Sequence, residues 1–149
     1  MKVSLLFPPT WHPSQPYLSL PSLTGFLTQA GIKNVSQRDL GIELLDKILT
    51  QGFAHNLYPQ LVEKQRSLER ERTGETGPGS AEQLARVIES LDRFPYLFER
   101  IELAKDTLRG EGFYDIEAYR NSLFLIDKWL EVLSSLYFPT RMTVVDNQF

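Results

Sequence analysis

The sequence predicts an α/β fold that is helix-dominated overall, in which a small parallel Rossmann-like βαβ unit carries a large, mostly α-helical insertion. Three observations lead to this prediction. A short apolar run, Val3 to Phe7, opens the chain and stops at Pro8-Pro9, and such a proline pair neither completes a sheet ladder nor continues a helix. A helical apolar pattern and a second strand-like run follow within the first forty residues. Helical spacing then dominates from Gly41 to Phe138.

A helix is predicted between the first two strands. Apolar residues recur at helical spacing over 20–30. Ser19 is a candidate N-cap, Pro21 suits the first turn, and Gly31 suits the position just after the C-cap. The first strand is expected at about 2–7, the second at 33–38, next to Asp39, and a third at 142–146. We expect these strands to be parallel and adjacent, with the helix packed on one face.

The middle of the chain is predicted to be a series of helices. A short helix over 41–51 is expected to end at Gly52, and Asn56 is a candidate cap for the next one. The breaker-rich segment 73–80 follows, and Ser80 begins a capping-box pattern.

Two further residues divide the rest of the helical block. Pro95 is expected to restart the chain, and Asp115 is expected to cap the longest helix, whose apolar stripe includes Leu123 and Leu130. An insertion of this length usually provides a lid, a partner surface or a substrate platform.

Composition limits the function classes. The chain has 149 residues, a net charge of −3 and no cysteine. No basic cluster is present, so neither nucleic acid nor an anionic membrane surface is an expected partner. The absence of cysteine excludes disulfides, thiol catalysis and cysteine-based metal sites within this chain. A cytoplasmic location is the expectation.

The first forty residues also contain four segments with a recognisable order: LLFPP, the loop TWHPSQPYLSL, the helix end LTQAGI, and the strand end QRDL. In this order they resemble the start of the cobalamin-binding domain of radical S-adenosylmethionine enzymes. The resemblance covers the first quarter of the chain well, the last ten residues weakly, and the middle not at all. It implies a cobalamin-binding-like domain over 1–40 and 139–149, interrupted by a helical insertion over 41–138.

Two family features are missing from this sequence. The Asp-x-His-x-x-Gly signature, whose histidine ligates cobalt in classical cobalamin domains, is absent, as it is from many radical members of the family. The CxxxCxxC triplet that holds the family's 4Fe-4S cluster is also absent. We therefore expect the chain to be the N-terminal part of a longer enzyme, not catalytic alone. Its expected partners are a downstream radical S-adenosylmethionine domain, which would bind S-adenosylmethionine and the cluster, and an unknown substrate.

The candidate cofactor-binding residues lie where the expected strands end. They are Thr10, Trp11, Ser14, Asp39, Asp146 and Asn147. If the three strands are parallel neighbours, these residues meet at the carboxyl edge of the sheet, where ligands bind in open α/β folds. Alternatives remain for individual residues, because Trp11 could simply fill a gap and Asp39 could cap the following helix. His12 is interpreted as a solvated loop residue, and no catalytic or metal-ligating residue is assigned.

Three functions follow from these patterns. The first is the cobalamin-binding-like N-terminal part of a radical S-adenosylmethionine enzyme. The second is a helical interaction module that uses 41–138 to dock a peptide or subunit, which an exposed apolar patch on the 115–138 helix would favour. The third is a stand-alone small-ligand-binding α/β domain, which a pocket bordered by Thr10, Asp39 and Asp146 would favour.

Overall fold

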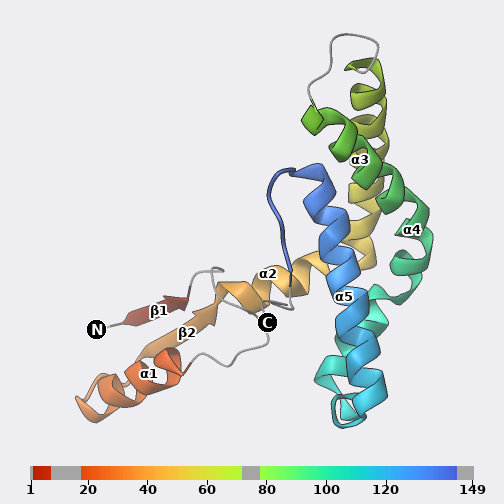
Figure 1. Cartoon of the computed structure of the whole chain (residues 1–149). Coiled ribbons are helices and arrows are strands. Elements are labelled where there is room, and N and C mark those ends of the chain that lie inside the picture. The colour runs from red at the N-terminus through yellow and green to blue at the C-terminus, as the bar shows by residue number, and fades with distance from the viewer. Residues whose placement is uncertain (1, 8–17, 72–77, 144–149) are drawn as a thin grey trace. The chain divides into compact units, whose positions relative to one another are not determined.

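The structure is a computed structural model of the chain, and it describes residues 2–7, 18–71 and 78–143 (Figure 1). These residues form two strands, five α-helices and one short 3-10 helix, so the described chain is dominated by helix, as predicted. The chain divides into two compact units, Met1–Ile48 and Leu49–Phe149. The predicted division into 1–40 with 139–149, and 41–138, stays a prediction.

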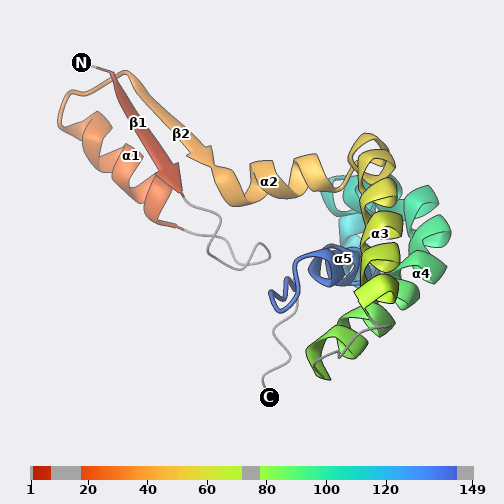
Figure 2. The same cartoon turned by 90° about the horizontal axis from the view of Figure 1, so that it is seen from above.

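The first unit is built on two parallel strands joined by a helix. β1 (Val3–Phe7) and β2 (Val35–Asp39) pair in parallel, in a register that sets their last residues, Phe7 and Asp39, opposite each other. α1 (Ser19–Gln29) packs against both strands, and Figure 2 shows it lying alongside them. The predictions of parallel, adjacent first and second strands and of a helix packed on them are therefore confirmed.

The two faces of this sheet differ in burial. Along β1 the side chains at 3, 5 and 7 are partly buried and those at 4 and 6 are exposed, which is the alternation expected of a strand with one covered face. On the exposed face the hydroxyl groups of Ser4 and Ser36 share a hydrogen bond of 3.0 Å. Leu6 lies on that face with 57% of its surface exposed.

The expected third strand is not seen in the described residues. Their sheet has two strands, and Met142 and Thr143, where the third strand would begin, are not in strand conformation. Residues 144–146 lie outside the described part. The structure therefore shows two parallel strands, and a three-stranded Rossmann-like unit stays a prediction.

The two ends of α1 differ in how well the sequence predicts them. Its C-terminus forms a Schellman motif, in which Gly31 N–H donates to the Thr28 carbonyl and Ile32 N–H to the Leu27 carbonyl. Gly31 has a φ of 85°, a conformation that favours glycine, so its predicted role is confirmed. The N-cap prediction is wrong, because Ser19 is the first helical residue and Leu18 occupies the cap position.

The second unit consists of helices that pack in sequence order. α3 (Gln51–Glu71) packs against α4 (Pro78–Arg109), and α4 packs against α5 (Ile116–Leu136). A short 3-10 helix, η1 (Glu111–Tyr114), joins α4 to α5. Figure 1 shows α5 running beside α4. α4 is therefore the helix that both neighbours share.

Several predicted boundaries in the helical region are wrong. α2 (Leu40–Ile48) ends before Gly52, which lies inside α3, and the Thr50 hydroxyl accepts from Phe53 N–H at the start of α3. Asn56 is an interior residue of α3 that donates its side-chain amide to the Gly52 carbonyl. Ser80 likewise lies inside α4, which begins at Pro78.

Proline does not interrupt α4, contrary to the prediction. Pro95 is an exposed interior residue of this 32-residue helix. Its neighbours Phe94 and Leu97 are buried, and burial of such side chains provides a free energy comparable to the cost of about 3 kcal/mol for an interior proline. The longest described helix is therefore α4, and α5 is shorter.

The predicted apolar stripe of α5 is buried in its C-terminal half, at Ile126, Leu130 and Leu133, and not at its N-terminal end. Asp115 caps the helix as predicted, because its carboxylate accepts from the N–H groups of Glu117 and Ala118. Leu130 is buried, but Leu123 is only half-buried, and Phe124 is 60% exposed. Small polar residues take part in the seam with α4 instead. The buried residues of α5 are Ser122, Ile126, Trp129, Leu130, Val132, Leu133, Ser134 and Ser135.

Candidate functional site

The carboxyl edge of the two-stranded sheet is the first candidate site. Because Phe7 and Asp39 are register partners at the ends of parallel strands, β1 and β2 end at the same edge of the sheet. α1 connects the two strands, and Figure 2 shows its first turn at the end of the sheet that carries the two arrowheads. This edge is where α/β folds bind ligands.

Asp39 caps the helix that follows it. Its Oδ1 atom accepts hydrogen bonds from Gly41 N–H at 2.9 Å and from Ile42 N–H at 3.1 Å, which is the N-cap arrangement. Both bonds use the same oxygen, so Oδ2 has no hydrogen-bond partner among the described residues. The capping alternative from the sequence is thus observed, and one carboxylate oxygen is left to accept a donor from a ligand.

An ion pair lies next to Asp39 in the chain. The guanidinium group of Arg38 contacts both carboxylate oxygens of Glu43, with Nε donating to Oε1 at 2.8 Å. This bidentate geometry joins the end of β2 to α2. The hydrogen bond from Arg38, more than its charge, lowers the pKa of the Glu43 carboxyl below its ordinary value.

The first turn of α1 also offers backbone donors at this edge. Leu18 stands at its N-cap position and has no side-chain acceptor, and no acidic residue lies in the first turn. The N–H groups of a first helical turn have no acceptor within the helix. A polar ligand group at the edge could therefore accept from them, in addition to donating to Asp39.

The predicted site residues divide into two groups. Asp39 is described and lies at the predicted edge. Thr10, Trp11, Ser14, Asp146 and Asn147 lie outside the described residues, so their expected meeting with Asp39 stays a prediction. The pocket that Thr10, Asp39 and Asp146 were expected to border is untested for the same reason.

The edge can be compared with what a cobalamin would need. Amide groups around a corrin ring donate hydrogen bonds, and Asp39 Oδ2 is an acceptor that suits them. Groups of three or more histidine, cysteine, aspartate or glutamate side chains placed to hold a metal ion do not occur among the described residues. The described part of the edge therefore contains one free acceptor for a polar ligand group, and residues 2–7 and 18–48 contain no histidine that could ligate cobalt.

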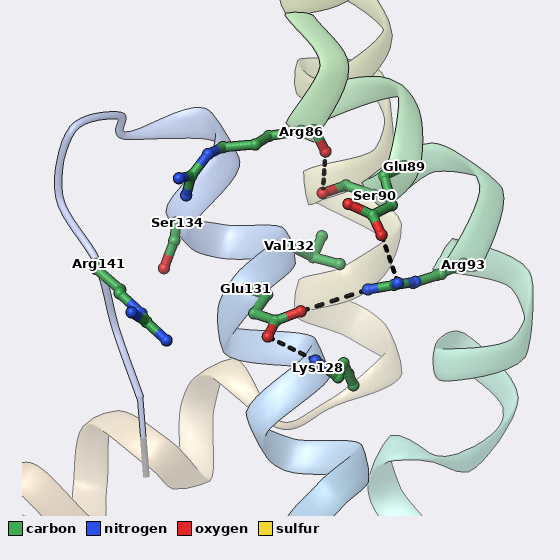
Figure 3. Close-up of a pocket in the computed structure, with 9 residues that line it drawn as sticks. All are labelled: Arg86, Glu89, Ser90, Arg93, Lys128, Glu131, Val132, Ser134 and Arg141. Carbon is green, nitrogen blue, oxygen red and sulfur yellow. Dashed lines mark hydrogen bonds and ion pairs between the residues drawn. The ribbon is translucent and has the colours of Figure 1, made fainter. Parts of the chain in front are cut away.

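A second candidate site lies in the helical unit, and the sequence analysis did not identify it. A cavity of about 470 Å³ is lined by α4, α5 and the segment after α5. Figure 3 shows its lining side chains, among which charged groups predominate. The lining residues are Arg86, Glu89, Ser90, Arg93, Lys128, Glu131, Val132, Ser134 and Arg141. They come from segments far apart in the sequence, and no spacing motif connects them.

Comparison with known proteins adds no family assignment. No protein-family model, curated protein or solved structure matches this chain. Among the helices of the described residues, none combines the length and the apolar character needed to cross a membrane. The functional argument therefore depends on the two candidate sites and on the residues that form them.

Proposed function

We propose that this chain is the cobalamin-binding-like N-terminal part of a radical S-adenosylmethionine enzyme and that it is not catalytic alone. The observation that supports it is the parallel pairing of β1 with β2, in which Phe7 and Asp39 are register partners. The segment LLFPP begins in β1, LTQAGI spans the end of α1, and QRDL spans the end of β2. Three of the four segments of the family resemblance thus reach the end of one element, and most of the fourth, TWHPSQPYLSL, lies outside the described residues.

In this proposal the carboxyl edge of the sheet holds the periphery of the cofactor. Asp39 Oδ2 accepts a hydrogen bond from a corrin amide, while Oδ1 continues to cap α2. Trp11 and the polar residues Thr10 and Ser14 contribute from the loop after β1, and Asp146 and Asn147 from the chain after Thr143. S-adenosylmethionine and the 4Fe-4S cluster bind in a downstream domain, because this chain has no cysteine.

The test is a titration of hydroxocobalamin into the product of the full gene, followed by its absorption spectrum. The gene should encode a CxxxCxxC triplet downstream of Phe149, and its product should bind the cofactor, whereas the 149-residue chain should bind weakly or not at all. Loss of a buried hydrogen bond or stacking contact in Asp39→Ala or Trp11→Ala should reduce affinity by about 1–3 kcal/mol. Absence of the triplet, or of binding by the full product, would refute the proposal.

Asp39→Asn separates ligand binding from capping. Asparagine caps a helix about as well as aspartate, so this variant should retain the stability of the wild type while losing the carboxylate charge. Reduced cobalamin affinity at unchanged stability would assign Asp39 to the ligand. Equal affinity of Asp39→Asn, Asp39→Ala and Trp11→Ala with the wild type would remove the edge from consideration.

A second candidate function is a helical interaction module, and one observation favours it. Large apolar side chains are exposed around the α4–α5 turn and along α5, with Tyr114 at 89% and Ile116 at 68%. Phe113 makes edge-on ring contacts with Tyr114 and Tyr119, so these three rings form a connected group.

The expected partner of this interaction module is the downstream domain. If the separately produced downstream domain binds the chain, and Tyr114→Ser with Ile116→Ser abolishes that binding, the module function is supported. Equal binding of the downstream domain by the wild-type chain and by the double variant would contradict the module function.

A further inference from the structure

The cavity between α4 and α5 has an excess of positive charge. Arg86, Arg93, Lys128 and Arg141 line it, against two carboxylates, Glu89 and Glu131. Four positive groups minus two negative groups leave a formal charge of +2 in a chain whose net charge is −3. The cavity is therefore locally opposite in sign to the whole molecule, which concentrates anions at this position.

The two carboxylates are already paired within the lining. Glu131 accepts from Lys128 Nζ at 2.6 Å and lies 3.4 Å from Arg93 Nη1. Glu89 forms an ion pair with the same arginine, and Figure 3 shows Arg93 between the two carboxylates. These contacts neutralise Arg93 and Lys128. Of the remaining two arginines, Arg86 forms an ion pair with a carboxylate outside the lining, so Arg141 carries the charge that no described carboxylate offsets.

Arg86 and Arg141 have no carboxylate partner within the cavity lining. Arg86 pairs with Glu82, which is not a lining residue, at 2.7 Å, and its guanidinium carbon lies 5.5 Å from the centroid of the Phe138 ring. Arg141 has no hydrogen bond or ion pair with any described residue. In Figure 3 both arginines are drawn on the side of α5 that carries Ser134. Two guanidinium groups from separate segments thus face one cavity.

The segment that carries Arg141 is held against α5 on both sides of that residue. Met142 N–H donates to Ser134 Oγ at 2.8 Å, and the Thr143 hydroxyl donates to Asp127 Oδ1 at 2.9 Å. Thr140 N–H donates to the Tyr137 carbonyl at 2.9 Å. Because the backbone is already fixed, a ligand that contacts Arg141 has to order only the side chain of this residue.

We propose that this cavity binds a small organic anion through a phosphate or carboxylate group, with Arg86 and Arg141 as the main binding residues. The planar guanidinium fork donates two parallel hydrogen bonds to either group. The volume of about 470 Å³ lies within the range of small-molecule sites. The proposal is independent of the function proposed above.

The test is a nuclear magnetic resonance titration of the 149-residue chain with sodium phosphate and, separately, with sodium citrate, at ionic strength held constant with sodium chloride. We expect saturable shifts of the backbone amides of Ser134, Arg141 and Met142 with at least one probe. Saturation by phosphate alone assigns a phosphate ligand, and saturation by citrate alone assigns a carboxylate ligand. No saturable shift at these amides with either probe would overturn the proposal.

Matched variants then locate the binding. Arg141→Gln removes the unpaired guanidinium and should weaken binding by about tenfold, the equivalent of losing one hydrogen bond to a charged group. Arg120→Gln makes the same charge change on α5 at a residue that does not line the cavity, and its affinity should equal that of the wild type. Equal weakening in both variants would show a general charge effect and overturn the site.

Arg86→Gln tests the cavity independently, because Arg86 lies on α4 and Arg141 lies after α5. It should also weaken binding by about tenfold, and a spectrum with wild-type dispersion would show that the fold is retained. Arg141→Lys retains the charge without the fork and should lie between the wild type and Arg141→Gln. Wild-type affinity in both Arg86→Gln and Arg141→Gln would contradict the assignment.

Discussion

Phe94 on α4 and Trp129 on α5 pack ring against ring, with centroids 5.6 Å apart and ring planes inclined by 53°. Both side chains are buried, and Trp129 has no exposed surface. Tilted aromatic pairs of this kind add about 0.5–1.5 kcal/mol to the free energy gained by burial. The pair therefore fixes the seam between the two helices that pack most extensively in the helical unit.

Removal of the larger ring should strongly destabilise the helical unit. Trp129→Ala should lower the free energy of unfolding by about 3–5 kcal/mol, because it leaves a cavity and removes one of the ring contacts of Phe94. Urea denaturation followed by circular dichroism measures this change. The control is Phe124→Ala on the exposed face of the same helix, which should change stability by about 0.5 kcal/mol or less. Similar losses in both variants would contradict the assigned seam.

Two leucines of α5 should differ in their contribution. Leu130 is 3% exposed, whereas Leu123 is half-buried. Leu130→Ala should cost about 2–5 kcal/mol of unfolding free energy, and Leu123→Ala should cost less because part of its side chain already contacts water. The same denaturation experiment compares them. A larger loss for Leu123→Ala would mean that α5 presents a different face to α4.

Replacement of the proline inside α4 should stabilise the protein. Pro95 is exposed and has no N–H group for the helical hydrogen bond. Pro95→Ala restores this donor and should raise the free energy of unfolding, by up to about 3 kcal/mol. Thermal unfolding monitored at 222 nm reports the change. A lower melting temperature in Pro95→Ala would show that the α4–α5 packing depends on a bend at this residue.

Protonation of Glu43 should weaken the contact between β2 and α2 in acid. The hydrogen bond from Arg38 lowers the pKa of Glu43 in the folded state. The contribution of this contact to stability is therefore complete above the unfolded pKa of about 4.3. That contribution disappears as the pH falls through the lowered folded value. A carbon-13 titration should place the Glu43 pKa below its ordinary value, and Arg38→Gln should restore it. An unchanged pKa in Arg38→Gln would rule out this contact as the cause.

Residues that act through local chemistry were predictable from the sequence. Gly31 after α1 and the cap at Asp115 depend on short segments, and the structure shows both. The parallel pairing of the first two strands followed from their order, with a helix between them. The roles assigned to Asn56 and Pro95 were wrong for a different reason. The tertiary contacts of α3 and α4 bury enough apolar surface to extend both helices through positions with poor helical propensity.

The two candidate sites also differ in whether the local sequence could predict them. Asp39 was predictable because it ends a strand and precedes a helix, two features of a single short segment. Arg86 and Arg141 line one cavity only because α4 packs on α5 and the chain then turns back along α5, with Met142 bonded to Ser134. No local pattern encodes that approach, so sequence analysis could not identify it.

The order in which the helices pack has a consequence for the route by which the protein folds. α3 packs on α4 and α4 on α5, so the main contacts of the helical unit join neighbours along the chain. Folding rates are highest for such local topologies. The pairing of β1 with β2, by contrast, closes a loop from Val3 to Val35 before any ladder hydrogen bond forms. During refolding of the whole chain, the helical hairpins are therefore expected to form first, and the parallel strands to pair in a later, slower step.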